Sequence, residues 1–126
     1  MTAVFRRTAP HLATAFVGMG GWAMIANHAH PWPEMLAAGA LQGSLSAGLT
    51  LAMKRLTEAV VGRLDRWPVV IAAPVACGLL SASVLTTLHT LAGTPEVAAT
   101  VAVPVAVSTL YAASYAMALT RLGVGR

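Results

Sequence analysis

The sequence predicts an all-α membrane protein with four transmembrane helices, and three observations lead to this fold class. The 126 residues are 57% hydrophobic and only 10% charged, with a mean hydropathy of +0.73, whereas roughly a quarter of the residues in soluble domains are charged. Four apolar stretches of about 20 residues, the length that crosses a bilayer, fill most of the chain. Half of the charged residues lie instead in one central segment, 54–66.

The apolar stretches form a single integral membrane domain of two hairpins. The predicted spans are about 10–27, 34–53, 68–91 and 96–119. They make up hairpin 1 (about 8–53), a connection (54–67) and hairpin 2 (about 68–120). Pro31 and Pro33 interrupt the first outer link, and Gly93 and Pro95 interrupt the second.

A cleaved signal peptide is the alternative interpretation of the first span. Arg6 and Arg7 precede an apolar run, as they would in a secretory signal. The run is long, however, and it contains Trp22 and three glycines. We therefore expect the first span to remain in the mature protein.

Small residues recur at helical spacing along the second span. Gly39, Gly43 and Ala47 lie four positions apart, and so do Ala40, Ser44 and Gly48. In lipid, apolar area gives little drive for helix association, and small residues let two backbones approach closely. The sequence therefore predicts that span two is the central, most crowded helix, packed through Gly39, Gly43, Ala47 and Gly48.

The basic connection has the pattern of an amphipathic helix. Leu56, Val60, Leu64 and Trp67 follow one another at spacings of four, four and three. The charged side chains lie on other faces. We expect this helix to lie at the membrane surface or to continue span two.

The positions of the basic residues predict the orientation. If all four spans cross, both termini and the connection share one side. That side holds every basic residue: Arg6, Arg7, Lys54, Arg55, Arg63, Arg66, Arg121 and Arg126. Since basic segments stay on the cytoplasmic side, the prediction is a multi-pass protein of a bacterial-type inner (plasma) membrane with both termini in the cytoplasm.

The two halves also resemble each other. His28 precedes Glu34 in the first outer link, and His89 precedes Glu96 in the second, at offsets of 61 and 62 residues. We interpret this as a tandem two-helix repeat. Both halves would begin in the cytoplasm, so the repeats would be parallel, related by an axis along the membrane normal.

Histidines and carboxylates gather at the outer links. His28, His30 and His89 could supply the three protein ligands of an open zinc site, with Glu34 or Glu96 as a base. The alternatives are that these side chains bind headgroups and loop carbonyls at the interface, or that they contact a lipid or another ligand. No other feature of the sequence predicts a cofactor.

Gln42 is the only strongly polar side chain near the middle of a predicted span. An interhelical hydrogen bond, which stabilises a membrane protein by about 1 kcal/mol, is the first hypothesis for it. The alternative is a polar crevice for a ligand, lined by Gln42, Ser46, Thr86 and Thr87.

The sequence contains no catalytic signature. It has one cysteine, Cys77, and no phosphate-binding glycine loop or nucleophile elbow. The net charge of +4 comes without a basic-aromatic platform, so nucleic acid is not an expected partner. No Asp, Glu, Lys or Arg lies inside a predicted span, although coupled transporters usually place one there.

These observations predict a non-enzymatic accessory or scaffold subunit. It would pack with itself as a homo-oligomer, with a membrane-protein partner or with membrane lipid. The first alternative is a subunit of a lipid or small-solute transporter or flippase. The second is a small metal-dependent membrane enzyme with a histidine cluster at the outer leaflet.

Overall fold

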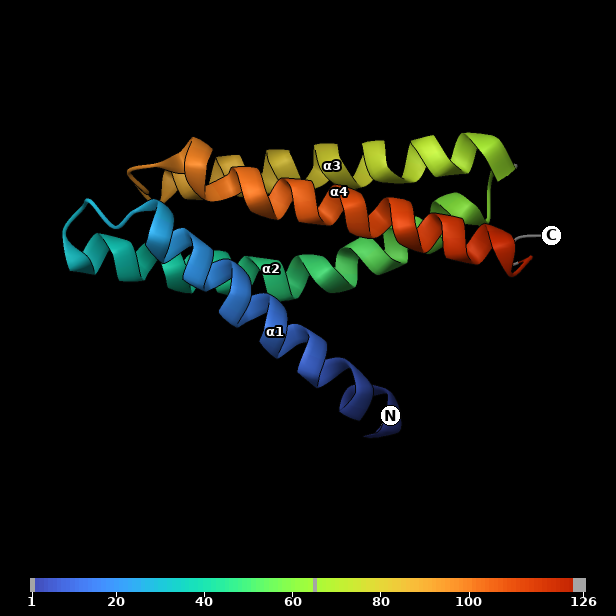
Figure 1. Cartoon of the computed structure of the whole chain (residues 1–126), viewed down its shortest axis with the longest axis horizontal. Coiled ribbons are helices and arrows are strands. Elements are labelled where there is room, and N and C mark those ends of the chain that lie inside the picture. The colour runs from blue at the N-terminus through green and yellow to red at the C-terminus, as the bar shows by residue number, and fades with distance from the viewer. Residues whose placement is uncertain (1, 65, 124–126) are drawn as a thin grey trace.

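The computed structural model describes residues 2–64 and 66–123, and every regular element among them is a helix. The helices are α1 (Thr2–Ala26), α2 (Trp32–Val61), α3 (Arg66–Leu91) and α4 (Val97–Arg121) (Figure 1). The α1–α2 and α3–α4 turns lie at one end of the molecule, and the α2–α3 connection lies at the other (Figure 1). The all-helical prediction is confirmed.

Three of the helices are long and apolar enough to cross a membrane. They are Trp32–Val61, Pro68–Leu91 and Val97–Arg121. The described part of α1 is not among them, because His11 and the glycines between positions 18 and 21 make it less apolar. A multi-pass helical membrane protein is therefore the class that the structure supports.

α1 and α2 approach most closely where glycine faces glycine. A Cβ atom added to Gly20 would lie 2.8 Å from the carbonyl oxygen of Gly39. One added to Gly43 would lie 2.8 Å from the carbonyl oxygen of Phe16. Since both obstacles are backbone atoms, the two helices can touch at this distance only with glycine at these positions.

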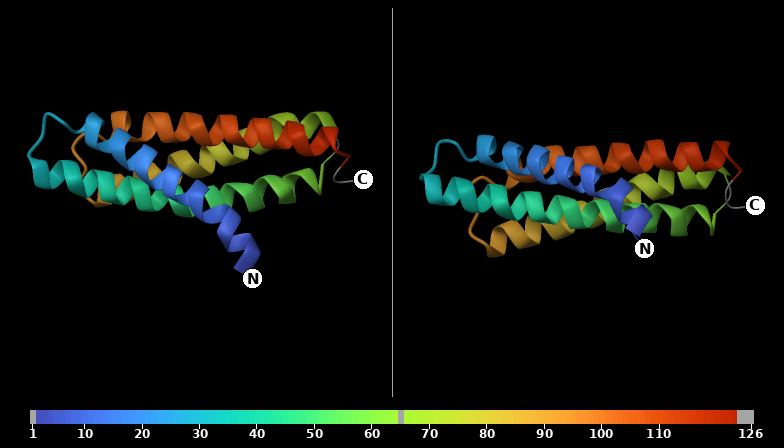
Figure 2. Two further views of the ribbon diagram at one scale, coloured as in Figure 1. Left: turned by 60° about the horizontal axis from the view of Figure 1, so that its bottom comes forward. Right: turned by 90° about the horizontal axis from the view of Figure 1, so that it is seen from below.

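α1 leaves the bundle on the amino-terminal side of this contact. Figures 1 and 2 show that the first half of α1 diverges from the other three helices. Gly20, Ala23 and Asn27 are buried, whereas the side chains of Phe16 and Val17 are 43% and 70% exposed. Only about the last three turns of α1, from Phe16 onward, are therefore part of the four-helix bundle.

α2 continues through the first half of the basic connection, which makes it 30 residues long. In this part its buried residues are Met53, Thr57 and Val61. The predicted apolar face is thus displaced by one position, because Leu56 and Val60 are only half-buried and Leu64 is exposed. The fourth member, Trp67, has a side chain outside the described residues.

Two small apolar clusters hold α2 against the second hairpin. Val61 packs with Val69, Ala73 and Ala116. Met53 packs with Cys77 and Ala112. Small side chains dominate both clusters. α2, α3 and α4 therefore lie close together towards the end of the bundle that carries the α2–α3 connection.

A candidate polar site at the turn end of the bundle

Asn27 directly follows α1, and its buried side chain joins α1 to the beginning of α4. Its Nδ2 donates hydrogen bonds to the carbonyl oxygen of Ala23 and to Thr100 Oγ1, both at 2.8 Å. Its Oδ1 accepts the backbone N–H of Glu96 at 3.0 Å. The first N–H groups of a helix have no partner within the helix, so Asn27 supplies an acceptor just where α4 begins.

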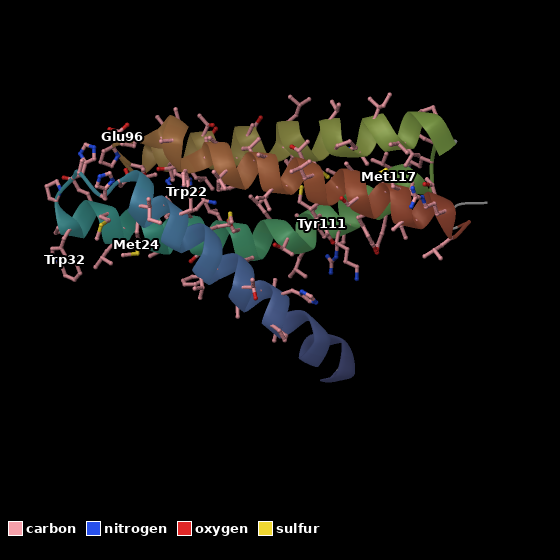
Figure 3. The ribbon with its side chains drawn as sticks, viewed as in Figure 1. Trp22, Met24, Trp32, Glu96, Tyr111 and Met117 are labelled. Carbon is pink, nitrogen blue, oxygen red and sulfur yellow. The ribbon has the colours of Figure 1, made fainter. Side chains whose placement is uncertain are left out.

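Two further contacts link α1 and its turn to α4. The indole nitrogen of Trp22 donates to the carbonyl oxygen of Ala99 at 3.0 Å. His30 Nε2 lies 3.0 Å from Glu96 Oε1, with both side chains partly open to the surroundings. Figure 3 shows Glu96 at the turn end and Trp22 where α1 passes α4.

Gln42 joins α2 to the end of α3. Its Nε2 donates to Ser46 Oγ at 2.8 Å, and its Oε1 lies 2.8 Å from His89 Nε2. The other ring nitrogen of His89 lies 2.8 Å from Thr94 Oγ1, in the α3–α4 turn. Gln42 and His89 are both fully buried. The hypothesis of an interhelical hydrogen bond from Gln42 agrees with this geometry.

The two sets of bonds are reciprocal between the halves. Asn27 ends the first helix of one hairpin and bonds to α4, the second helix of the other. His89, 62 residues later, ends the first helix of the second hairpin and bonds to α2. Each hairpin therefore offers a polar side chain to its counterpart at the same end of the bundle.

The three histidines considered as metal ligands have separate partners. His28 is exposed, and its Nδ1 bonds to the carbonyl oxygen of Ile25 at 2.7 Å. His30 bonds to Glu96, and His89 bonds to Gln42 and Thr94. Among residues 2–64 and 66–123 no three His, Cys, Asp or Glu side chains are grouped closely enough to hold a metal ion. Glu34, the other candidate base, is exposed.

The residues proposed to line a polar crevice divide into two pairs. Gln42 and Ser46 are buried and bonded to each other. Thr86 and Thr87 are exposed on α3. The structure thus joins His89, rather than the threonine hydroxyls, to Gln42.

The predicted packing residues also fall on different sides of α2. Gly39 and Gly43 are buried against α1, and Ala47 is half-buried. Gly48 is exposed, and a Cβ atom added there would meet nothing within 4 Å.

Trp22, Thr94 and Thr100 were not identified from the sequence as parts of this site. Threonine and tryptophan are common in membrane helices and at their ends, so no spacing distinguishes these residues from the others of their kind. The position of Asn27 beside the histidines was the one available signal.

The buried polar side chains of this site all have hydrogen-bond partners within the chain. Within the described part of the chain, no buried side-chain nitrogen or oxygen lacks a hydrogen-bond partner. Such a network fastens helices together, because the alternative for each group is an unpaired dipole in an apolar surrounding. It presents no unpaired buried group to a substrate or cofactor. No protein-family model, curated protein or solved structure matches this chain.

Proposed function

We propose that this chain is a four-span protein of a bacterial-type inner membrane, with both termini in the cytoplasm, and that it acts as a non-enzymatic accessory or scaffold subunit. It packs with itself, with a partner membrane protein or with lipid. The observation that carries this proposal is that, in the described residues, every buried side-chain nitrogen and oxygen has a hydrogen-bond partner within the chain. The exposed surface of the helices includes large apolar side chains, among them Val17, Ile71 and Leu79, and the small residues Ala40, Ser44 and Gly48 of α2.

The dimensions of α2 are compatible with this topology. A helix of 30 residues is about 45 Å long at about 1.5 Å per residue, whereas the hydrocarbon core is about 30 Å thick. The last turns of α2, which carry Lys54 and Arg55, would then extend into the cytoplasmic headgroup region. In this topology α1 also crosses, since Arg7 and Asn27 are separated by 20 residues.

The free small-residue face of α2 is the proposed association surface. Ala40, Ser44 and Gly48 are exposed and lie four positions apart. The neighbouring face, with Gly39 and Gly43, is already occupied by α1. Association with another helix would therefore depend on Gly48 rather than on Gly43.

Two leucine substitutions test this proposal in the full chain. Gly48→Leu should reduce oligomer size or partner recovery in mild detergent and leave thermal stability unchanged. Gly43→Leu is the contrasting variant, since its side chain would collide with Phe16 and lower stability. If the wild-type protein is a monomer without a cross-linked or co-purified partner, or if Gly48→Leu associates normally, the scaffold proposal is wrong.

A further inference from the structure

Beyond their closest contact, α1 and α2 present two diverging faces. Gly43 packs against Phe16, and on the amino-terminal side of Phe16 the axis of α1 diverges from α2 (Figure 1). Ala13 and Ala9 come three and seven residues before Phe16, so they continue its face of α1. Ala47 and Thr50 come four and seven residues after Gly43 and continue that face of α2. Ala9 and Ala13 are exposed, and Ala47 and Thr50 are half-buried.

The hydroxyl group on the α2 face is already satisfied within its own helix. Thr50 Oγ1 donates to the carbonyl oxygen of Ser46 at 2.8 Å. Thr50 therefore presents mainly its methyl group to the surroundings. The aromatic ring of Phe16, 43% exposed, stands where the faces meet. An apolar chain fits such surroundings.

Two cations stand beside each other at the open end of α2. Lys54 is eleven residues after Gly43, which brings it to within about 20° of the same face of the helix. Arg55, the next residue, lies at nearly the same depth and about 120° round the helix from that face. Both are exposed. At about 1.5 Å per residue, Lys54 lies about 33 Å along α2 from Trp32, just beyond a hydrocarbon core of about 30 Å. The two charges are thus at headgroup depth.

The acid nearest to these cations along α2 forms no ion pair with either of them in the described residues. Glu58 follows Lys54 by four residues and Arg55 by three, which are the spacings of helical ion pairs. Its Oε1 instead accepts a hydrogen bond from the Tyr115 hydroxyl of α4 at 2.7 Å. In the described ranges the ion pair within 4.0 Å is His30 with Glu96, at the opposite end.

We infer that the diverging faces of α1 and α2 hold one anionic phospholipid of the cytoplasmic leaflet, with its phosphate on Lys54 and Arg55 and an acyl chain against Ala13, Phe16 and Thr50. The inference rests on the proposed topology, and it specifies the lipid among the partners of the proposed function. A cation pair at the mouth of an apolar wedge matches an amphiphile with an anionic head. A partner helix would have to place an acid at this depth.

Native mass spectrometry of the detergent-purified full chain tests the inference, with dioleoyl phosphatidylglycerol and dioleoyl phosphatidylcholine as probes. We expect the first phosphatidylglycerol molecule to bind at least tenfold more tightly than phosphatidylcholine. The double variant Lys54→Gln, Arg55→Gln should lose most of this preference. Ala13→Phe, which fills the apolar face without changing charge, should weaken the binding of phosphatidylglycerol.

The matched control removes two cations from the same end of the molecule. Arg63→Gln with Arg121→Gln, both at exposed positions, should keep the tenfold preference. Equal losses in the two double variants would reduce the effect to the general field of the basic end and overturn the site. A wild-type protein that binds phosphatidylglycerol and phosphatidylcholine equally would also overturn it. So would an Ala13→Cys variant that forms a disulfide between two chains and then binds no lipid, because a second chain would occupy the face. Since Gly48→Leu tests association separately, a lost lipid preference with intact association would count against this inference alone.

Discussion

Gln42 and His89 fix each other's orientation. The amide nitrogen of Gln42 donates to Ser46, so its oxygen is the atom that faces His89. His89 Nε2 must then carry a hydrogen, and its Nδ1 can accept the hydroxyl hydrogen of Thr94. A single neutral tautomer satisfies all four residues. An apolar substitution of Gln42 leaves His89 Nε2 unpaired, and an apolar substitution of His89 leaves Gln42 Oε1 unpaired, in an apolar interior.

Substitution of Gln42 by Leu should lower the free energy of unfolding by about 1 kcal/mol, the scale of interhelical hydrogen bonds in membranes. The double variant with His89→Leu should lose less than the sum of the single losses, because the second substitution removes a group that the first left unpaired. Denaturant unfolding in mixed micelles measures these values. Thr86→Val, at an exposed position of α3, is the control and should be near neutral. Additive losses would mean that Gln42 and His89 are not coupled.

Asn27 should be more sensitive than Gln42. Asn27→Ala removes three hydrogen bonds, to Ala23, Thr100 and the backbone of Glu96, and should lower the free energy of unfolding by about 2 kcal/mol. Thr100→Val removes one of these bonds and should have a smaller effect in the same assay. A loss from Thr100→Val as large as that from Asn27→Ala would contradict this order.

At the scale of helices, the close contact of α1 and α2 makes neighbouring glycines unequal. A Cβ atom on Gly20 would lie 2.8 Å from a backbone oxygen of α2, which has no rotamer to adopt. One on Gly21 would meet nothing within 4 Å. Both residues lie in the same turn of the same helix, so they differ in packing and not in local propensity.

Gly20→Ala should therefore lower stability by about 1–3 kcal/mol, the usual range for an overpacked contact. Gly21→Ala should be neutral or stabilising, because alanine favours a helix by about 1 kcal/mol over glycine. Thermal unfolding of the two variants, followed by circular dichroism in one detergent, measures the difference. If both substitutions have the same effect, the close contact is not where the structure puts it.

The sequence was a good guide to the presence of the helices and a poor guide to their faces. Apolar composition and the prolines of the links were sufficient to predict four helices. In lipid, however, the side of a helix that faces its neighbours and the side that faces the membrane are both apolar. This explains why the face through Leu56 and Val60 was predicted in place of Met53, Thr57 and Val61. It also explains why Gly20 was overlooked, since it belongs to no series of small residues at a spacing of four.

At the scale of the whole molecule, one end carries the turns and the other carries the described basic side chains. Lys54, Arg55, Arg63 and Arg121 lie towards the end of the α2–α3 connection. Arg6, Arg7, Arg66 and Arg126, also part of the predicted charge asymmetry, have side chains outside the described residues. The orientation in a membrane stays a prediction from the positive-inside rule.

Single cysteines in a Cys77→Ala background would establish this orientation. Ala29→Cys and Ala92→Cys, at exposed positions in the two turns, should react with a membrane-impermeant maleimide in intact bacterial cells. Arg63→Cys and Leu122→Cys should react only after permeabilisation. The opposite pattern would invert the proposed topology, and labelling of Arg63→Cys and Ala29→Cys from the same side would show that α2 does not cross.

The reciprocal bonds of Asn27 and His89 suggest that the chain is two hairpins joined by a dispensable connection. Co-expressed fragments 1–63 and 64–126 should therefore assemble, because each keeps a complete helix pair and the bonds between them need no covalent link. Recovery of the untagged fragment with the tagged one measures assembly. Asn27→Ala with Gln42→Leu in the first fragment should reduce recovery several-fold, whereas Thr86→Val with Thr87→Val in the second should not. If the fragments fail to assemble even without substitutions, the hairpins depend on their connection, and the tandem-repeat hypothesis loses its main structural support.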